Sequence, residues 1–175
     1  MRGRPIGRSI GWSVDDGCRY VGSGRTATVT DAESDPESDP NRWFLDNHDH
    51  LQGLGIAILH QEEGSVRLAL PYDESLANPG TGVLQGGVVA TLIDHAGGAA
   101  IRTVLEEPLS TPHASTDLNV TYLRPATADL TADATVVKAG RSMGVVEVEV
   151  TADTPSGERR VAVGRVTLHL DRESE

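Results

Sequence analysis

The 175-residue sequence predicts one α+β domain in which a single long helix packs against an antiparallel sheet. Three patterns support this prediction. Apolar residues recur at helical spacing from Gly86 to Val104, and from Ser115 onward apolar and polar residues alternate. A shorter stretch before the helix, residues 55–72, alternates on both sides of a Glu-Glu-Gly turn. Alternation of this kind is typical of antiparallel strands that cover a helix with one face and leave the other face to water.

We expect residues 1–38 to form a flexible leader, residues 39–171 to form the domain and residues 172–175 to be a tail. Residues 31–40 read DAESDPESDP, with Ala32 as the one apolar residue. Such a stretch buries too little surface to offset the entropy lost on ordering. Beyond it, residues 41–55 predict one short amphipathic helix, with Asp39 as its N-cap and Gly53 as its end.

The central helix is the strongest local prediction. Its apolar residues lie three and four positions apart, on one face; they are Val89, Leu92, Ile93, Ala96, Ala100 and Val104. Gly97 and Gly98 interrupt it, and each costs about 1 kcal/mol relative to alanine. We therefore expect another backbone to approach closely there, as a wrapping sheet would.

The C-terminal third predicts four strands in a meander. Turns are expected at Arg124-Pro125, at Gly140 and at Pro155-Ser156-Gly157. In the last strand, RRVAVGRVTLHL, the alternation changes phase, which predicts a bulge around Gly164.

The composition excludes several classes of function. A formal charge of -11 and only 3% aromatic residues argue against nucleic acid as a partner. One cysteine, Cys18, cannot form an internal disulfide, and His48 and His50 point to different sides of a helix, so no metal site is expected. No apolar run is long enough to span a membrane. Fourteen Arg, one Lys and high acidity fit a soluble cytoplasmic protein from a salt-rich cell.

Two features around the central helix could carry chemistry. Gly86 and Gly87 lie where a loop becomes the helix, so unpaired N–H groups there could stabilise an oxyanion. The alternative is a turn that needs only flexible residues. Asp94 lies among apolar residues of the helix and is a candidate general base or nucleophile, whereas the alternative is a solvated aspartate on the polar side.

Three blocks of sequence, NPGTGVLQGGVVATLIDHAGGAA, STDLNVTYLRPA and VVKAGRSMGVVEVEV, resemble the hotdog-fold acyl-CoA thioesterases of the PaaI (phenylacetyl-CoA thioesterase) type. The resemblance covers about residues 42–170. It implies an antiparallel sheet wrapped around one long helix, and hydrolysis of an acyl-CoA thioester with no separate cofactor. It also implies a homodimer or a dimer of dimers, with sites at the subunit boundary.

The resemblance also implies roles for individual residues. Asp94 would act as general base or nucleophile, the Gly86 N–H would polarise the thioester carbonyl, and Asn78 would help to hold the attacking water or the aspartate. Ser115 would support the nucleophilic water. The family usually has His before the glycine pair, and Gln85 here can form hydrogen bonds but cannot titrate.

Substrate contacts are expected from a further set of residues. The turn formed by Lys138, Gly140 and Arg141 resembles the family's region near the coenzyme A phosphates. Besides these, the predicted binding residues are Gly87, His113, which could line the pocket, and Arg124, for which a plain turn is the alternative to a nucleotide contact. His95 faces about 100° away from Asp94 and is expected to pack or to lie at the rim.

The geometry of a helix predicts a dimer independently of the family resemblance. Asp94 follows Gly86 by eight residues, which is about 12 Å along a helix axis. One thioester cannot touch both groups, so a second chain must bring its own Asp94 to the first chain's Gly86. Two other classes of function stay open: a non-catalytic acyl-CoA binding protein, and a hotdog hydratase or dehydratase.

Overall fold

The computed structural model describes residues 19–22, 25–28 and 38–172, which fall into two units. The first unit, residues 1–33, contains a two-stranded antiparallel hairpin, β1 (Arg19–Gly22) and β2 (Arg25–Thr28). The remainder of the predicted leader, including Cys18, and most of the predicted tail lie outside the described residues. The flexibility of the leader and the domain boundaries therefore stay predictions.

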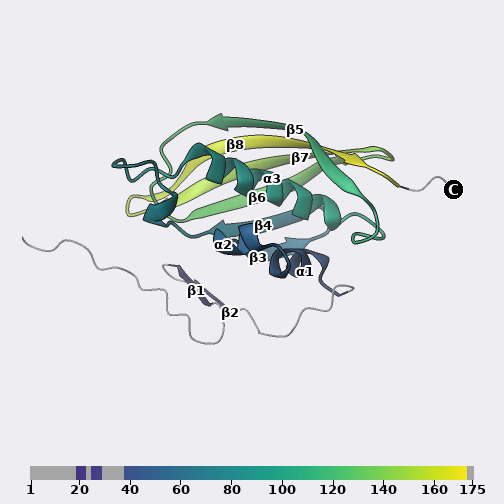
Figure 1. Ribbon diagram of the computed structural model, residues 1–175, viewed down its shortest axis with the longest axis horizontal. Helices are drawn as coiled ribbons and strands as arrows, with labels where there is room; N and C mark the ends of the chain where they lie inside the picture. Colours follow the sequence, from purple (N-terminus) through teal and green to yellow (C-terminus); the bar gives the residue numbers. More distant parts are fainter. Residues whose placement is uncertain (1–18, 23–24, 29–37, 173–175) are drawn as a thin grey trace, which may run out of the picture. The chain divides into compact units, whose positions relative to one another are not determined.

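The second unit is a six-stranded antiparallel sheet curved around one long helix (Figure 1). The helix is α3 (Gly86–Arg102), and a short 3₁₀ turn, η1 (Glu74–Leu76), precedes it. The strand order is β3-β4-β6-β7-β8-β5. The strands are β3 (Ala57–Glu62), β4 (Ser65–Leu70), β5 (His113–Tyr122), β6 (Leu130–Ala139), β7 (Met143–Thr154) and β8 (Gly157–Leu170). This is the predicted α+β hotdog architecture.

The predicted four-strand meander is wrong for its first strand. Strands β6, β7 and β8 follow one another as hairpins, but β5 pairs with β8 at the far edge of the sheet. Between β5 and β6 the chain passes β8 and β7, and β6 pairs with β4 on its other side. Alternation indicates which face of a strand is buried but not which strand lies beside it.

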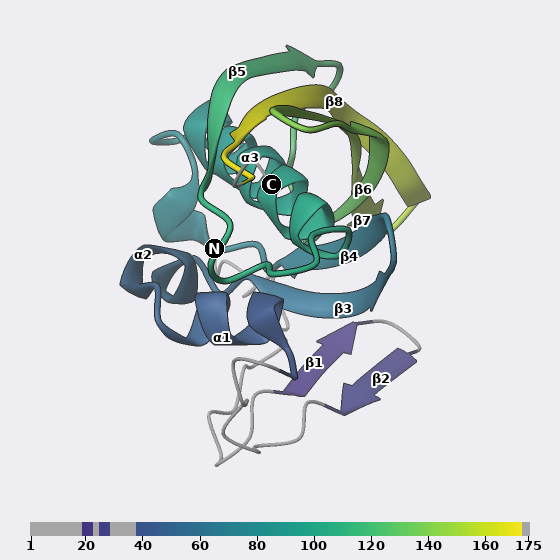
Figure 2. The ribbon, with the colours of Figure 1, turned by 90° about the vertical axis from the view of Figure 1, so that its right-hand side faces the viewer.

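The core lies between α3 and the concave face of the sheet, as Figure 2 shows in a view along the helix. The predicted helical face is buried: Leu92, Ile93, Ala96 and Ala100 have no exposed surface. Val104 lies just beyond the helix end and packs against this core. Burial of a leucine or isoleucine side chain contributes about 1.5–3 kcal/mol, so this face fixes the helix on the sheet.

Glycines allow the helix and the sheet to approach closely. A Cβ added at Gly97 would lie 2.6 Å from Val166 Cγ2, and one at Gly164 would lie 2.5 Å from Ile93 Cγ2. The expected close approach is thus confirmed at Gly97. It is wrong at Gly98, where an added Cβ would meet only Arg102 Nη2 at 3.7 Å, because Gly98 faces away from the sheet.

The bulge expected around Gly164 lies three residues earlier. The register between β7 and β8 shifts where Thr151 pairs with Arg160 and Val150 pairs with Ala162, which leaves Val161 as the extra residue. Beyond it the pairing of β8 is regular through Gly164. Gly164 interrupts the pattern because it is a core-facing position without a side chain, not because the strand changes phase.

The segment predicted as one short helix forms two, α1 (Pro40–Asp46) and α2 (Asp49–Gly53). The Asp39 carboxylate accepts a hydrogen bond from the Arg42 N–H and caps α1, as predicted. The chain breaks at Asn47, whose side chain donates to the Trp43 carbonyl in place of a continued helix. Among the described residues, no helix is long and apolar enough to cross a membrane.

Candidate active site

A cavity of about 590 Å³ lies beside the middle of α3, at the β5 edge of the sheet. It is bounded by α1, α2, α3, the loop after α3 and the start of β5. Its lining residues include Trp43, Phe44, His48, Leu51, Thr91, Asp94, His95, Gly98, Arg102, Leu109, His113 and Ser115. It therefore contains three of the predicted site residues, namely Asp94, His113 and Ser115.

Asp94 and Ser115 form the one direct contact between predicted catalytic residues. The Ser115 hydroxyl donates a 2.6 Å hydrogen bond to Asp94 Oδ1. Ser115 is near the start of β5, directly before a bulge in the pairing with β8 at Thr116, and Asp94 is only partly buried. The contact fixes one carboxylate oxygen and leaves the other without a hydrogen-bond partner among the described residues.

The start of α3 presents backbone donors. Gln85 is the N-cap, and its side-chain oxygen accepts a hydrogen bond from the Val88 N–H. The N–H groups of Gly86 and Gly87 have no hydrogen-bond partner within the described residues. Tyr122 of β5 donates a 2.7 Å hydrogen bond to the Gly86 carbonyl, which holds this first turn against the sheet edge. The arrangement leaves two amide donors at a positive helix end.

These two groups lie apart in one chain. Gly86 is the first residue of α3 and Asp94 is in its third turn, about 12 Å along the axis. Neither Gln85 nor Gly86 lines the cavity that holds Asp94. Asn78 is also separate: it is exposed in the loop before α3, and its backbone bonds to Val83 and Thr81. Within a single chain, the predicted catalytic residues thus lie in two separate places.

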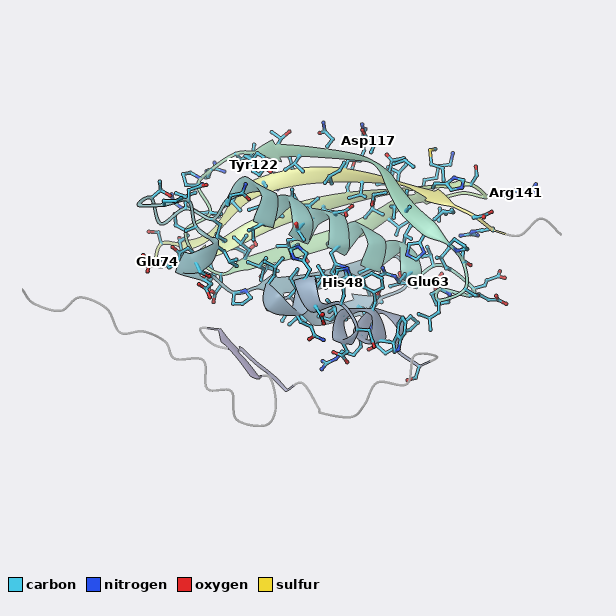
Figure 3. All side chains as sticks on the ribbon, viewed as in Figure 1. His48, Glu63, Glu74, Asp117, Tyr122 and Arg141 are labelled. Carbon is cyan, nitrogen blue, oxygen red and sulfur yellow. The ribbon has the colours of Figure 1, made fainter. Side chains whose placement is uncertain are left out.

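The predicted coenzyme A contacts lie in two places. Gly140 and Arg141 line a second cavity of about 1070 Å³ that shares Thr111 and Pro112 with the Asp94 cavity. Figure 3 shows Arg141 at one end of the sheet and Tyr122, which contacts Gly86, towards the other end. Lys138 lies on the same β6–β7 turn and is exposed.

Arg124 is at the opposite end and donates to the Arg160 carbonyl at 2.8 Å. This hydrogen bond favours a structural role for Arg124 in the turn over a contact with the nucleotide of coenzyme A.

Sequence reasoning missed a buried cluster at the inner end of the cavity. His95 and Arg102 are only 8% and 6% exposed. The Phe44 ring stacks on His95 with centroids 5.7 Å apart, and the guanidinium of Arg102 lies 3.9 Å from the centre of the same ring. The sequence contained one signal for this cluster. Asp94, Gly98 and Arg102 follow one another at intervals of four residues, so they lie along one side of α3, apart from its apolar face.

Burial and nearby cationic side chains lower the pKa of two histidines of this cavity, His95 and His113. Desolvation lowers the pKa of His95 to about 3, with further lowering by Arg102 and by His48. The pKa of His113 is lowered mainly by desolvation and also by Arg102, against a raising effect of its hydrogen bond with the Thr111 carbonyl. Desolvation alone lowers the pKa of Arg102, to about 10, so Arg102 stays charged at neutral pH. Of the two places expected for His95, packed or at the rim, its 8% exposure indicates the packed one.

Comparisons with known proteins agree with this fold and site. Residues 81–158, which include Gln85, Asp94 and Ser115, match the model of the thioesterase superfamily. The chain is 46% identical over 135 residues to a protein with a provisional esterase name from Halobacterium salinarum, covering 74% of this chain and 89% of that protein. It is 31% identical over 117 residues to human acyl-coenzyme A thioesterase 13, covering 66% of this chain and 79% of that enzyme.

Solved structures show the same likeness. A thioesterase family protein from Silicibacter pomeroyi superposes with a TM-score of 0.72 at 29% identity, covering 76% of this chain and 96% of that one. A thioesterase from Haemophilus influenzae superposes with a TM-score of 0.65 at 28% identity, and the match covers 79% of this chain and 92% of that one. With the long helix, the wrapped sheet and the carboxylate beside its cavity, these matches show that the chain belongs to the thioesterase superfamily and is a thioester hydrolase of the hotdog fold.

Proposed function

We propose that this protein hydrolyses acyl-CoA thioesters and that Asp94 activates or performs the attack. The observation that carries the proposal is the Asp94 carboxylate, held by Ser115 at the wall of a cavity large enough for an acyl group. The name of the human relative gives the coenzyme A part of the substrate. The assignment to the PaaI type in particular stays a prediction.

The proposed reaction needs side chains, backbone amides and water, and no separate cofactor. In the general-base form, Asp94 takes a proton from water while the water oxygen bonds to the thioester carbon. The carbonyl electrons move to oxygen, where the Gly86 N–H and the helix end stabilise the charge. As the carbonyl re-forms, the C–S bond breaks and coenzyme A leaves as its thiolate. In the nucleophilic form, Asp94 itself bonds to the carbon and water hydrolyses the resulting anhydride.

The mechanism requires two copies of the chain. Strand β5 is a sheet edge, and nearly all of its residues are exposed, including Leu118 and Tyr122 at 40% and 54%. An edge with unpaired backbone groups and exposed apolar side chains favours pairing with a second copy. We propose a two-fold dimer in which the Gly86 of one chain meets the partner's Asp94, and the oligomer beyond the dimer stays open.

The roles of the neighbouring residues follow from their contacts. Because the Gln85 side chain caps the Val88 N–H, it keeps the helix start formed and leaves the Gly86 and Gly87 amides for the substrate. Asn78 would orient the attacking water from the loop before the helix. Lys138, Gly140 and Arg141 would bind the coenzyme A phosphates at the mouth of the second cavity.

Replacement of the carboxylate tests the chemistry. Asp94→Asn should lower kcat for a panel of short, long and aromatic acyl-CoA thioesters by about 10²–10⁴-fold, since a positioned base contributes that much. Asp133→Asn is the matched control, because Asp133 pairs with Arg67 on the outer face of the sheet. Normal hydrolysis by a folded Asp94→Asn variant would contradict the assignment. Retention of acyl-CoA without turnover would favour a binding protein, and water addition to an enoyl-CoA would favour a hydratase.

A mixing experiment tests the shared site. Gly86→Pro removes the amide hydrogen, and proline is tolerated at the first position of a helix. Gly86→Pro and Asp94→Asn should each be inactive on their own. In an equal, randomly exchanged mixture about half of the dimers contain one chain of each variant, and one of the two sites in each such dimer is intact. The mixture should therefore regain about a quarter of the wild-type activity. No recovery, in mixtures shown by native mass spectrometry to contain mixed dimers, would show that the site is not shared in this way.

A further inference from the structure

Arg102 is a buried cation whose charge no residue of the described chain neutralises. It is 6% exposed, and no carboxylate of the described residues forms an ion pair with it. Its partners among the described residues are neutral: the Asn41 side-chain oxygen accepts from Nη1 at 3.2 Å, and the Phe44 ring lies under the guanidinium. Glu62 and Glu106 line the neighbouring cavity of about 380 Å³ without pairing with it. Burial of a charge without a counter-charge is costly, so the position calls for an anion.

The free donors of Arg102 can be reached from the Asp94 cavity. A guanidinium has five N–H donors, and only Nη1 has a partner among the described residues. Nη2 lies 3.7 Å from the point where a Cβ of Gly98 would stand, so the glycine leaves the group uncovered. Both residues line the cavity that contains Asp94. The donors thus face the space into which an acyl chain would extend.

His95 supplies a second unsatisfied group beside this one. It is 8% exposed, it lines the same cavity, and its Nε2 has no hydrogen-bond partner within the described residues. The tautomer with hydrogen on Nε2 is a neutral donor. An unpartnered buried nitrogen on the wall of a cavity that also holds an unpaired cation indicates a polar, negatively charged ligand group at this place.

We propose that the acyl pocket accepts thioesters whose acyl chain ends in a carboxylate, and that Arg102 binds this carboxylate with His95 beside it. The inference rests on the proposed function, since it assumes that the thioester carbonyl is held at Asp94. Gly98, where Nη2 lies, is one helical turn beyond Asp94, or about 6 Å along the axis. With C–C bonds of about 1.5 Å, a zigzag chain advances about 1.25 Å per bond, so that about four to five bonds bring a terminal carboxylate within hydrogen-bond reach of a group about 6 Å away. Glutaryl-CoA and adipyl-CoA fit this length.

The test compares charged and neutral substrates of equal length at fixed salt. The wild-type protein should show a higher kcat/KM for glutaryl-CoA than for pentanoyl-CoA by about 10- to 100-fold, the effect of a buried charge-assisted hydrogen bond. Arg102→Met should reduce that ratio at least tenfold, whereas Arg102→Lys should keep part of it. Arg67→Met, which removes an exposed guanidinium on the outer face, is the matched control and should leave the ratio unchanged.

A binding measurement separates this inference from the proposed function. Calorimetry with ketone analogues of the two substrates, in which a methylene replaces the sulfur, needs no turnover. Tighter binding of the glutaryl analogue, lost in Arg102→Met, would support the carboxylate site even if no thioester were hydrolysed. Asp94-dependent hydrolysis with a glutaryl-to-pentanoyl ratio at or below one would overturn it and leave the proposed function standing. The wild-type ratio also decides the matter if the Arg102 variants fail to fold.

Discussion

His95 should make the stability of this protein depend on pH between neutrality and pH 5. The perturbation is the substitution His95→Gln, which removes the titrating group and keeps a polar side chain of moderate size. In the folded protein desolvation, Arg102 and His48 hold the pKa of His95 at about 3, against an ordinary value of 6.5. The folded protein therefore contains His95 as the neutral imidazole at every pH well above 3.

The sign and the size follow from linkage. Below pH 6.5 the unfolded chain binds a proton at this histidine, while the folded protein does not until about pH 3. The free energy of unfolding therefore falls as the pH falls, by up to about 1.4 kcal/mol per pH unit within this range. Between pH 7 and pH 5 the loss from His95 is about 2 kcal/mol. His113 has a lowered pKa as well and acts in the same direction, but it is present in both proteins and cancels in their difference.

Urea unfolding at pH 7, 6 and 5, at fixed salt and fixed protein concentration, measures the effect. The wild type should lose about 2 kcal/mol more than His95→Gln over this range, whatever the absolute stability of the variant. His60→Gln is the matched control, because the His60 side chain is 63% exposed on β3 and should not alter the difference. Equal losses in wild type and His95→Gln would refute the claim that the fold excludes the imidazolium.

Two further substitutions test the packing of α3 and the positioning of the carboxylate. Gly97→Ala should lower the free energy of unfolding relative to Gly98→Ala by about 1–3 kcal/mol, because its Cβ would lie 2.6 Å from Val166 whereas that of Gly98 would meet only Arg102 Nη2, at an ordinary contact distance of 3.7 Å. Equal melting temperatures of the two variants would contradict the close contact. Ser115→Ala removes the 2.6 Å hydrogen bond to Asp94 and should lower kcat by about tenfold or more in a thioester assay, with folding intact by circular dichroism. An unchanged kcat would mean that Asp94 needs no such support.

The positions of the helices and strands could be predicted from local sequence patterns, but which strands pair with one another could not. The helical spacing from Gly86 gave the start of α3, and its end lies two residues before the predicted Val104. The partner of β5 depends on how the sheet closes around the helix, which no single segment determines. The break at Asn47 depends on one side-chain hydrogen bond in competition with the helix.

The residues of the candidate site also fall into those that the sequence indicated and those that only the folded structure brings together. Asp94 and Ser115 were both singled out from the sequence, but the hydrogen bond between them was not expected, since the resemblance gave Ser115 a role toward the water. The separation of Gly86 from Asp94 along α3 follows from the rise of a helix. Arg102 and its cluster with His95 were missed, because their burial comes from α1 and α2 folding over α3. That packing depends on Phe44 and Asn41, which are distant in sequence and have no pattern that links them to the helix.

The glycine contacts between α3 and the sheet restrict where this architecture can hold a ligand. With Gly97 against Val166 and Gly164 against Ile93, this stretch of α3 lies in direct contact with the sheet and leaves no room for a ligand at those points. Besides α3, the start of β5 and Leu168 of β8, the cavity at Asp94 is walled by α1, α2 and the loop after α3, which are not part of the sheet. Acyl preference can therefore diverge through exchanges in these peripheral pieces while the scaffold that aligns the reacting groups is left intact.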